Sequence, residues 1–211
     1  MAGIASIAIV GHSFVAGLES LVTRDAACTP ALGLTGCRAT WLGVRGGRVG
    51  NSAMIRSWGE TLPAARPEVV IMLIGDNDIA SDAQVEDADE LASQLVAMAS
   101  LLRAKSRAQA VYICQLMPRF PSGFSNPRHP FNPQYNEIAR TVNEAVERQV
   151  RTVPGLRFWA HRFVASPSAN ARRANALQRR FVAKDGVHLN KKGLVVLYKS
   201  LRDLLTGHRR R

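Results

Sequence analysis

Five short apolar runs alternate with segments of helical periodicity along this chain of 211 residues. The runs are almost continuously apolar, whereas a strand with one solvated face would alternate between apolar and polar residues. Continuous apolar strands are typical of a parallel sheet that helices cover on both faces. We therefore predict an α/β fold, a three-layer α/β/α sandwich with right-handed crossovers. The predicted strands are Ile4–Val10, Ala39–Val44, Val69–Ile74, Ala110–Met117 and Leu156–Trp159.

The segments between these runs carry apolar residues at helical spacing. The predicted helices are Phe14–Thr23, Val49–Trp58, Gln84–Ala104, Pro133–Val150 and Lys191–Leu205. In the last of them, Leu194, Leu197 and Leu201 recur at intervals of three or four positions. We find no internal repeat and no clear second domain. The prediction is one domain over residues 1–207, followed by a basic tail over 208–211.

Positive charge is concentrated in the C-terminal part of the sequence. The formal net charge is +12, and residues 151–211 hold 15 of the 28 Lys and Arg but only two of the 16 Asp and Glu. This asymmetry suggests an anionic partner such as RNA, an acidic membrane surface or an acidic protein. A solvated basic face that keeps the protein soluble explains it equally well. The candidate anion-binding residues are Arg172, Arg173, Arg179, Arg180 and Lys184.

Motif spacing and run length argue against several classes of protein. The three cysteines, Cys28, Cys37 and Cys114, match no zinc-binding spacing, so we predict no metal site. No apolar run approaches the length of a membrane span. The first residues lack the basic start and long apolar core of a secretory signal. We therefore expect an intracellular protein.

Four short polar or glycine-rich motifs stand at strand ends or just before a helix. They are Gly11-His12-Ser13, Gly43-Val44-Arg45-Gly46-Gly47, Gly75-Asp76-Asn77-Asp78 and Asp185-Gly186-Val187-His188. Open α/β folds place their sites at the carboxyl edge of the sheet, where such strand ends meet. Together the motifs offer a hydroxyl, oxyanion donors, a base and a carboxylate. These are the parts of a serine hydrolase.

Ser13 follows a predicted buried strand and opens a predicted helix. This position puts its hydroxyl at the sheet edge and turns its backbone N–H towards an anion. The alternative is that Ser13 caps the helix, which is the commonest role of a serine at such a turn. Taken alone, the motif favours the cap.

Asp185 and His188 stand three positions apart, and Gly186 between them supports a tight turn. Histidine is the natural base near neutral pH, and a carboxylate on one ring nitrogen fixes its tautomer and stabilises the cation. The alternative is an Asx turn beside a surface histidine, and it is the commoner meaning of such a motif on its own.

The glycine-rich and asparagine motifs supply candidate oxyanion donors. The Asn77 amide could donate where negative charge develops, and loss of one such donor typically costs about 3–4 kcal/mol of transition-state stabilisation. Gly46 could offer an unobstructed backbone N–H. The alternatives are a polar turn in which Asp78 caps local structure, and an ordinary glycine turn. Turns alone do not explain all four motifs in this order.

In this order the motifs resemble the SGNH hydrolase (GDSL esterase/lipase) superfamily, and the resemblance covers nearly the whole chain. It implies a flavodoxin-like sandwich with a five-stranded parallel sheet. It also implies hydrolysis of carboxylic esters, acetyl or longer acyl, without a cofactor. By resemblance Ser13 is the nucleophile and an oxyanion donor, with Gly46 and Asn77 as further donors. His188 is then the base, and Asp185 orients it.

His12 stands where the superfamily usually has Asp, a residue that organises the site without being the triad acid. The histidine could serve as a substitute hydrogen-bond partner, add positive potential beside the oxyanion, or mark a site of altered activity. We therefore treat His12 as a possible modulator, with a purely structural histidine as the default.

A looser resemblance links the chain to the esterase domain of LINE-type retrotransposon first-open-reading-frame proteins. It rests on Gly11-His12-Ser13-Phe14-Val15, on Val187-His188-Leu189-Asn190 and on the basic C-terminal third. This resemblance implies an alternative function, a nucleic-acid- or acidic-membrane-binding module with weak or vestigial esterase activity. Aromatic residues make up only 6% of the chain, so few platforms exist for base stacking.

Overall fold

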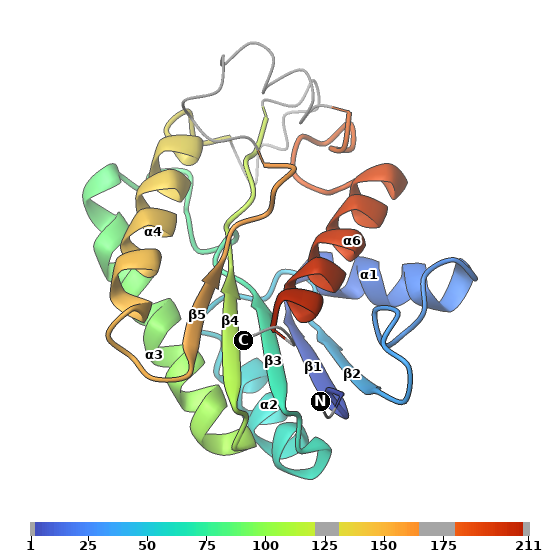
Figure 1. Ribbon diagram of the computed structural model, residues 1–211. Coiled ribbons are helices and arrows are strands. Elements are labelled where there is room, and N and C mark those ends of the chain that lie inside the picture. Colours follow the sequence, from blue (N-terminus) through green and yellow to red (C-terminus); the bar gives the residue numbers. More distant parts are fainter. Residues whose placement is uncertain (1–2, 121–130, 165–179, 209–211) are drawn as a thin grey trace.

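A single five-stranded sheet forms the centre of the molecule in the computed structural model, which describes residues 3–120, 131–164 and 180–208 (Figure 1). All neighbouring strands are parallel, and their order is β2-β1-β3-β4-β5. This order is the flavodoxin-like arrangement, so the predicted five-stranded parallel sheet is confirmed. The strands are β1 (Ser6–Gly11), β2 (Arg38–Gly43), β3 (Val69–Leu73), β4 (Ala110–Cys114) and β5 (Leu156–Trp159).

Helices cover both faces of the sheet, as predicted for a three-layer sandwich. Helices α1 and α6 lie on one face, and α2, α3 and α4 lie on the other (Figure 1). A short 3-10 helix, η1 (Val85–Asp87), leads into α3. The helices are α1 (Ser13–Arg24), α2 (Ser52–Ala65), α3 (Ala88–Ser106), α4 (Tyr135–Val150) and α6 (Lys191–His208). Within these described parts, no helix has the length and apolar character that a membrane crossing needs.

The two faces of each central strand belong to different apolar cores. In β1, Ile7 and Ile9 pack with α1 and α6, whereas Ala8 and Val10 pack with α2, α3 and α4. All four side chains are at most 1% exposed. Burial on both faces removes any place for a polar residue, which explains why the run is continuously apolar.

Strand β4 ends at Cys114, three residues before the predicted end at Met117. The reason lies in the hydrogen bonds of the following backbone. The N–H of Leu116 donates to Asn143 Oδ1 at 2.8 Å, and the N–H of Met117 donates to Asp76 Oδ1 at 2.9 Å. Side chains thus replace the neighbouring strand as acceptors, and one of these side chains belongs to a predicted site motif.

Helix α2 extends to Ala65, seven residues beyond the predicted end at Trp58. It begins after Asn51, whose side chain accepts a hydrogen bond from the N–H of Met54 at 3.0 Å. The buried side chain of Leu62 continues the apolar face of the helix beyond Trp58. Packing on the sheet therefore sustains the helix through Pro63.

Gly11 lets the carboxyl ends of β1 and β3 approach each other closely. A Cβ atom at this position would lie 2.0 Å from the carbonyl oxygen of Leu73, so no larger residue fits. The next N–H, from His12, donates to the same oxygen at 3.0 Å. Glycine therefore fixes where the chain leaves the sheet and where His12 and Ser13 stand.

Candidate active site

Ser13 is the first residue of α1 and is partly buried. The helix cap is supplied by the preceding residue, because His12 Nδ1 accepts a hydrogen bond from the N–H of Phe14 at 3.4 Å. The alternative that Ser13 itself caps the helix is therefore wrong. Its Oγ instead contacts His12 Nδ1, also at 3.4 Å.

His12 and Asp76 form a buried pair beneath Ser13. His12 Nε2 lies 2.7 Å from Asp76 Oδ2, and the two side chains are only 2% and 6% exposed. Asp76 Oδ1 accepts two further hydrogen bonds, from the N–H of Met117 at 2.9 Å and the hydroxyl of Tyr135 at 3.2 Å. Every donor around this carboxylate thus comes from a different part of the chain.

The electrostatic setting keeps Asp76 ionised despite its burial. Burial by itself raises the pKa of Asp76, but it is outweighed by the hydrogen bond from His12, the positive charge of that ring whenever it is protonated, the charge of Arg119 and the Met117 N–H. The pKa therefore lies below its usual value. An ionised Asp76 favours the tautomer in which His12 carries its proton on Nε2.

Asp185 and His188 form a second pair, at the turn before α6. His188 Nδ1 lies 2.7 Å from Asp185 Oδ2, and the side chains are 50% and 48% exposed. Asp185 Oδ1 accepts from the backbone N–H groups of Val187 and His188, each at 2.9 Å. The Asx turn and the histidine–carboxylate contact are thus both present, so the two alternatives do not exclude each other.

The same hydrogen bonds tune Asp185. Burial raises the pKa of Asp185, but the side-chain and backbone hydrogen bonds from His188 and the N–H of Val187 lower it by more, so the net pKa is below the usual value. Between the described residues Ser13 and His188 there is no direct hydrogen bond. The structure thus joins the predicted pair and leaves the serine bonded to the other histidine.

Asn77 links two of the predicted motifs at the sheet edge. Its Nδ2 donates to the carbonyl of Gly47 at 3.1 Å, and its Oδ1 accepts from Arg119 Nη2 at 3.0 Å. Only one of the two Asn77 amide hydrogens is used within the described part of the chain. Gly46 adopts a left-handed φ of 70° and leaves open space where a side chain would begin.

Asp78 has a structural task next to the site. Its two carboxylate oxygens accept from the N–H of Val49 at 3.0 and 3.2 Å, which holds the chain ahead of α2. Burial raises the pKa of Asp78 to about 6, although the Val49 N–H and the charge of Arg48 lower it. Asp78 therefore stands apart from Asp76 and Asp185, whose pKa values are lowered.

His161, at the end of β5, is a buried residue of this region that sequence reasoning missed. Its Nδ1 lies 2.9 Å from Ser200 Oγ, and its Nε2 has no hydrogen-bond partner among the described residues. Burial lowers the pKa of His161 to about 3, so the ring is neutral at pH 7. The only sequence signal for His161 is its place two residues after the end of a predicted strand.

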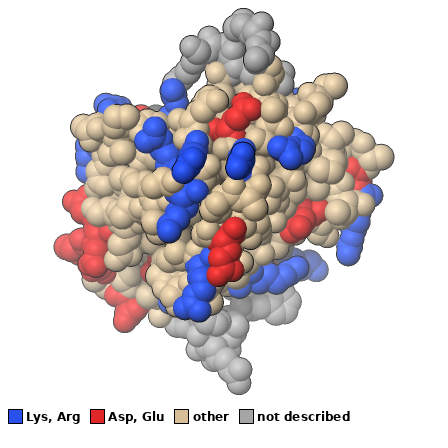
Figure 2. All heavy atoms as spheres, turned by 90° about the horizontal axis from the view of Figure 1, so that it is seen from below, with Lys and Arg blue, Asp and Glu red and all other residues tan. Residues whose placement is uncertain are grey.

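Of the candidate anion-binding residues, Arg172, Arg173 and Arg179 lie outside the described residues. Arg180 and Lys184 are exposed, and neither forms an ion pair within the described part. Figure 2 shows the opposite end of the molecule, where Lys and Arg side chains are spread across the surface with Asp and Glu among them. Basic side chains are therefore also present on the surface remote from Arg180 and Lys184.

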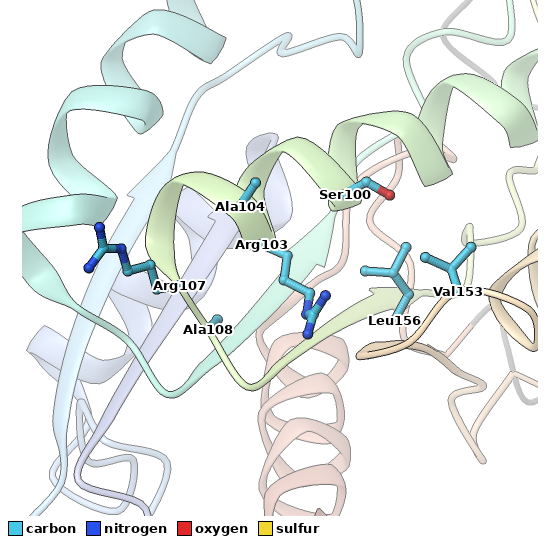
Figure 3. A pocket seen from close by; sticks show the side chains of 7 residues that line it. All are labelled: Ser100, Arg103, Ala104, Arg107, Ala108, Val153 and Leu156. Carbon is cyan, nitrogen blue, oxygen red and sulfur yellow. The ribbon is translucent and has the colours of Figure 1, made fainter.

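Two hollows help to locate the site. The larger, of about 350 Å³, lies between the end of α3 and the start of β5, at the amino edge of the sheet and away from Ser13 (Figure 3). A narrower apolar hollow lies next to the Asp185–His188 turn. It is lined by Met117, Pro118, Phe163, Val164, Phe181, Val182, Val187 and Leu189. Only the second adjoins predicted site residues.

The sheet order and the two helical layers place the chain in the flavodoxin-like class of α/β proteins. The family model described as GDSL-like lipase/acylhydrolase matches residues 9–194, and the chain belongs to this family. No curated protein sequence matches the chain. No cluster of three metal-binding side chains occurs among residues 3–120, 131–164 and 180–208.

Solved structures of similar fold carry related descriptions. A GDSL-like lipase from Bacteroides thetaiotaomicron is 14% identical, with a TM-score of 0.67 over 97% of this chain and 89% of that chain. A lipase/acylhydrolase from Enterococcus faecalis is 18% identical, with a TM-score of 0.65 over 97% of both chains. An acetyl esterase variant crystallised with an acetate ion is 15% identical, with a TM-score of 0.61 and 97% of both chains covered. At these identities the likeness concerns the fold, and family membership supports a hydrolase.

Proposed function

We propose that the protein hydrolyses carboxylic esters through an acyl-enzyme formed on Ser13. The observation that carries this proposal is the position of Ser13. Its side chain is released from capping α1 by His12, and its hydroxyl contacts a histidine ring at the carboxyl edge of the sheet. Membership of the GDSL-like lipase/acylhydrolase family supports the same chemistry.

In this mechanism His188 acts as the general base for Ser13. Because His188 Nδ1 is engaged with Asp185 Oδ2 at 2.7 Å, its proton lies on Nδ1 and the lone pair of Nε2 is available. The ionised Asp185 then stabilises the imidazolium that forms when the serine proton is taken up. The hydrogen bond between a catalytic serine and its histidine base is often long in a free enzyme and tightens when substrate binds.

Three donors are available for the oxyanion. The N–H of Ser13 stands at the N-terminus of α1, where helix amides are unpaired and the helix dipole favours negative charge. Neither this N–H nor that of Gly46 has a hydrogen-bond partner among the described residues. The second amide hydrogen of Asn77 completes the set. Such preorganised donors stabilise the developing negative charge without reorganisation.

The acyl group of the substrate is proposed to be acetyl or longer. The apolar hollow beside His188, with Val187 and Leu189 on either side of that histidine in sequence, offers apolar contact for an acyl chain. The hollow has space for only about 10 Å³, little more than one water molecule, so in this conformation an acyl group would rest against its mouth and not enter it. One of the similar structures is described as an acetyl esterase with acetate, in agreement with a short acyl group.

The test is labelling with a fluorophosphonate probe and hydrolysis of p-nitrophenyl acetate. We expect S13A to lose both, with a fall in ester hydrolysis of at least about a thousandfold. The matched control is S52A, because Ser52 is likewise the first residue of a helix and is exposed. Labelling at another residue, or equal rates for S13A and S52A, would rule out Ser13 as the nucleophile.

We propose as a second function the binding of an anionic partner, RNA or an acidic membrane, by the basic C-terminal third. The supporting observation is that Arg180 and Lys184 are exposed and have no acidic partner within the described part. Affinity for an RNA oligonucleotide should then fall steeply as salt is raised. Vesicles of anionic lipid, compared with neutral ones, provide the second arm. Absence of binding to both at low salt would exclude this function.

A further inference from the structure

Ser13 Oγ has a histidine acceptor in this structure, but it is not the histidine of the exposed pair. The atom within reach is His12 Nδ1, at 3.4 Å. Behind it, His12 Nε2 lies 2.7 Å from Asp76 Oδ2. Serine hydroxyl, imidazole and carboxylate thus form a continuous series, and all three groups belong to the candidate site.

The protonation of this series follows from its hydrogen bonds. The ionised Asp76 can only accept, so the Nε2 atom of His12 carries the proton and the Nδ1 atom carries the lone pair. The Ser13 hydroxyl can therefore donate to Nδ1. The tautomer is the opposite of that at His188, where Nδ1 is the protonated atom. Both neutral histidines thus carry a lone pair on the ring nitrogen that Asp does not hold. At His12 this nitrogen lies 3.4 Å both from the Ser13 hydroxyl and from the N–H of Phe14.

Asp76 is anchored more firmly than a lone carboxylate. It accepts from Met117 N–H, Tyr135 hydroxyl and His12 Nε2, which come from three separate segments. A carboxylate with several donors remains charged in a buried place and can stabilise an imidazolium next to it. His12 is therefore equipped as a base, and helix capping alone would not need this carboxylate.

We propose that His12 and Asp76 form a second, buried base for the Ser13 hydroxyl, beside the exposed pair of Asp185 and His188. This inference rests on the proposed function, because it needs Ser13 as the nucleophile. His12 is then a catalytic residue, since it touches the reacting oxygen. Asp76 acts through His12 and is a positioning residue.

The proton balance of the step is complete without a further reactant. As Ser13 Oγ bonds to the acyl carbon, its proton passes to His12 Nδ1, while the other ring proton stays on Nε2 and keeps its hydrogen bond to Asp76 Oδ2. The proton then goes to the leaving alkoxide as its bond to the acyl carbon breaks. In deacylation, water gives its proton to Nδ1 while its oxygen bonds to the acyl carbon, and Ser13 Oγ recovers that proton as it leaves.

Four proteins test the proposal: the wild type, H188A, H12Q and the double variant H12Q/H188A. Glutamine at position 12 keeps an N–H for Asp76 but cannot take a proton. We expect H188A to hydrolyse p-nitrophenyl acetate at least about a hundredfold faster than the double variant, since general base catalysis is worth about 10²–10⁴-fold. Equal rates for H188A and the double variant would overturn the proposal.

A pH profile separates a base from a structural contact. The residual rate of H188A should rise with pH through a single protonation step and then level off, and this step should be missing in the double variant. The titratable and charged groups around the pair, besides Asp76 itself, are Asp78, Cys114, Arg119, Tyr135 and His161. If H188A shows no such step, His12 is not the base.

A second substitution at position 12 tests whether His12 serves only as the cap of α1. H12N keeps a side-chain acceptor for the N–H of Phe14, because asparagine is a good helix cap, but it cannot act as a base. We expect H12N/H188A to be as slow as H12Q/H188A. If it keeps the rate of H188A, His12 serves the helix alone and the proposal falls.

Nitrogen-15 NMR of the wild type keeps the proposal testable even if a variant at position 12 fails to fold. We expect His12 to carry its proton on Nε2, with Nδ1 unprotonated, and the reverse tautomer would overturn the inference. If the wild type neither hydrolyses the ester nor reacts with the fluorophosphonate at Ser13, the proposed function itself fails. A wild type that reacts, with H188A no faster than the double variant, refutes only the second base.

Discussion

The two histidine–aspartate pairs at the carboxyl edge have the same nitrogen–oxygen distance but differ in their exposure to solvent. Each joins a ring nitrogen to a carboxylate oxygen at 2.7 Å. The pair of His12 and Asp76 is almost completely buried, whereas the pair of Asp185 and His188 is half exposed. Distance alone therefore does not tell what such a pair contributes, because water screens one pair and not the other.

The location of each pair follows from how the chain builds it. Asp185 and His188 are held by a local turn of four residues, which leaves the histidine accessible to substrate and water. His12 and Asp76 are 64 positions apart and meet only because β1 and β3 are neighbours. The exposed pair is suited to chemistry, and the buried pair is part of the fold as well as of the site.

The largest expected difference between the pairs concerns stability. We expect D76A to lower the free energy of unfolding by about 3–5 kcal/mol, because it leaves three buried donors without their acceptor. The matched change D185A should cost less than about 1 kcal/mol, since that carboxylate is half exposed. Urea unfolding measures both, and equal losses would contradict the comparison.

The exposed pair should matter little for stability but strongly for activity. D185N removes the charge that stabilises the His188 imidazolium, and we expect kcat/KM for p-nitrophenyl acetate to fall at least about a hundredfold. The control is D203N, because Asp203 is an exposed carboxylate on α6 outside the site. A rate for D185N within about tenfold of that for D203N would argue against a role for Asp185.

The third carboxylate of the edge should respond to pH in the opposite direction. Asp76 and Asp185 have lowered pKa values, so their contributions to stability exist above the unfolded pKa and disappear as pH falls through the folded pKa. Asp78 has a pKa raised to about 6, chiefly by burial, so stability is lost as pH rises through that value.

We expect the wild type to lose about 1–2 kcal/mol from Asp78 between about pH 4 and pH 7, after allowance for its partial exposure. D78N keeps an oxygen for the N–H of Val49 and cannot ionise, so this loss should vanish in the variant. Urea unfolding across the range measures it. A variant with the same pH dependence as the wild type would show that Asp78 is not responsible.

The smallest expected effect is that of an alanine at Gly46, and a second glycine of the same backbone conformation separates its strain from its effect on activity. Gly46 and Gly36 have left-handed φ values of 70° and 71°, and both have open space where a Cβ would lie. G46A and G36A should therefore each lose about 1 kcal/mol of stability through strain. Only G46A should also slow ester hydrolysis, because its methyl group stands beside a proposed oxyanion donor. Equal rates would remove Gly46 from the site.

The fold and the local part of the site could be predicted from the sequence because both leave local signals. Burial on two faces makes β1 and β3 continuously apolar, and the turn of Asp185 and His188 is complete within four residues. The end of β4 could not be predicted, because the N–H groups of Leu116 and Met117 donate to the side chains of Asn143 and Asp76, which are remote in sequence.

The buried pair of His12 and Asp76 could not be predicted either, because its two residues are remote in sequence. His12 was expected to be structural or modulating, and its contact with Asp76 depends on the order of strands rather than on spacing. The hydroxyl of Tyr135, on α4, joins the same carboxylate from yet another element. A sequence alone gives no sign of such a meeting, although the unusual His12 did mark the place.

The most direct test of the account is the site of acylation during turnover. D185N is mixed with p-nitrophenyl acetate, quenched in acid and mapped by peptide mass spectrometry, with the wild type and S13A alongside. The account predicts one acetyl group on Ser13 in the first two proteins and none there in S13A. Ester hydrolysis with the acetyl group on a different residue, or undiminished hydrolysis by S13A, would contradict it.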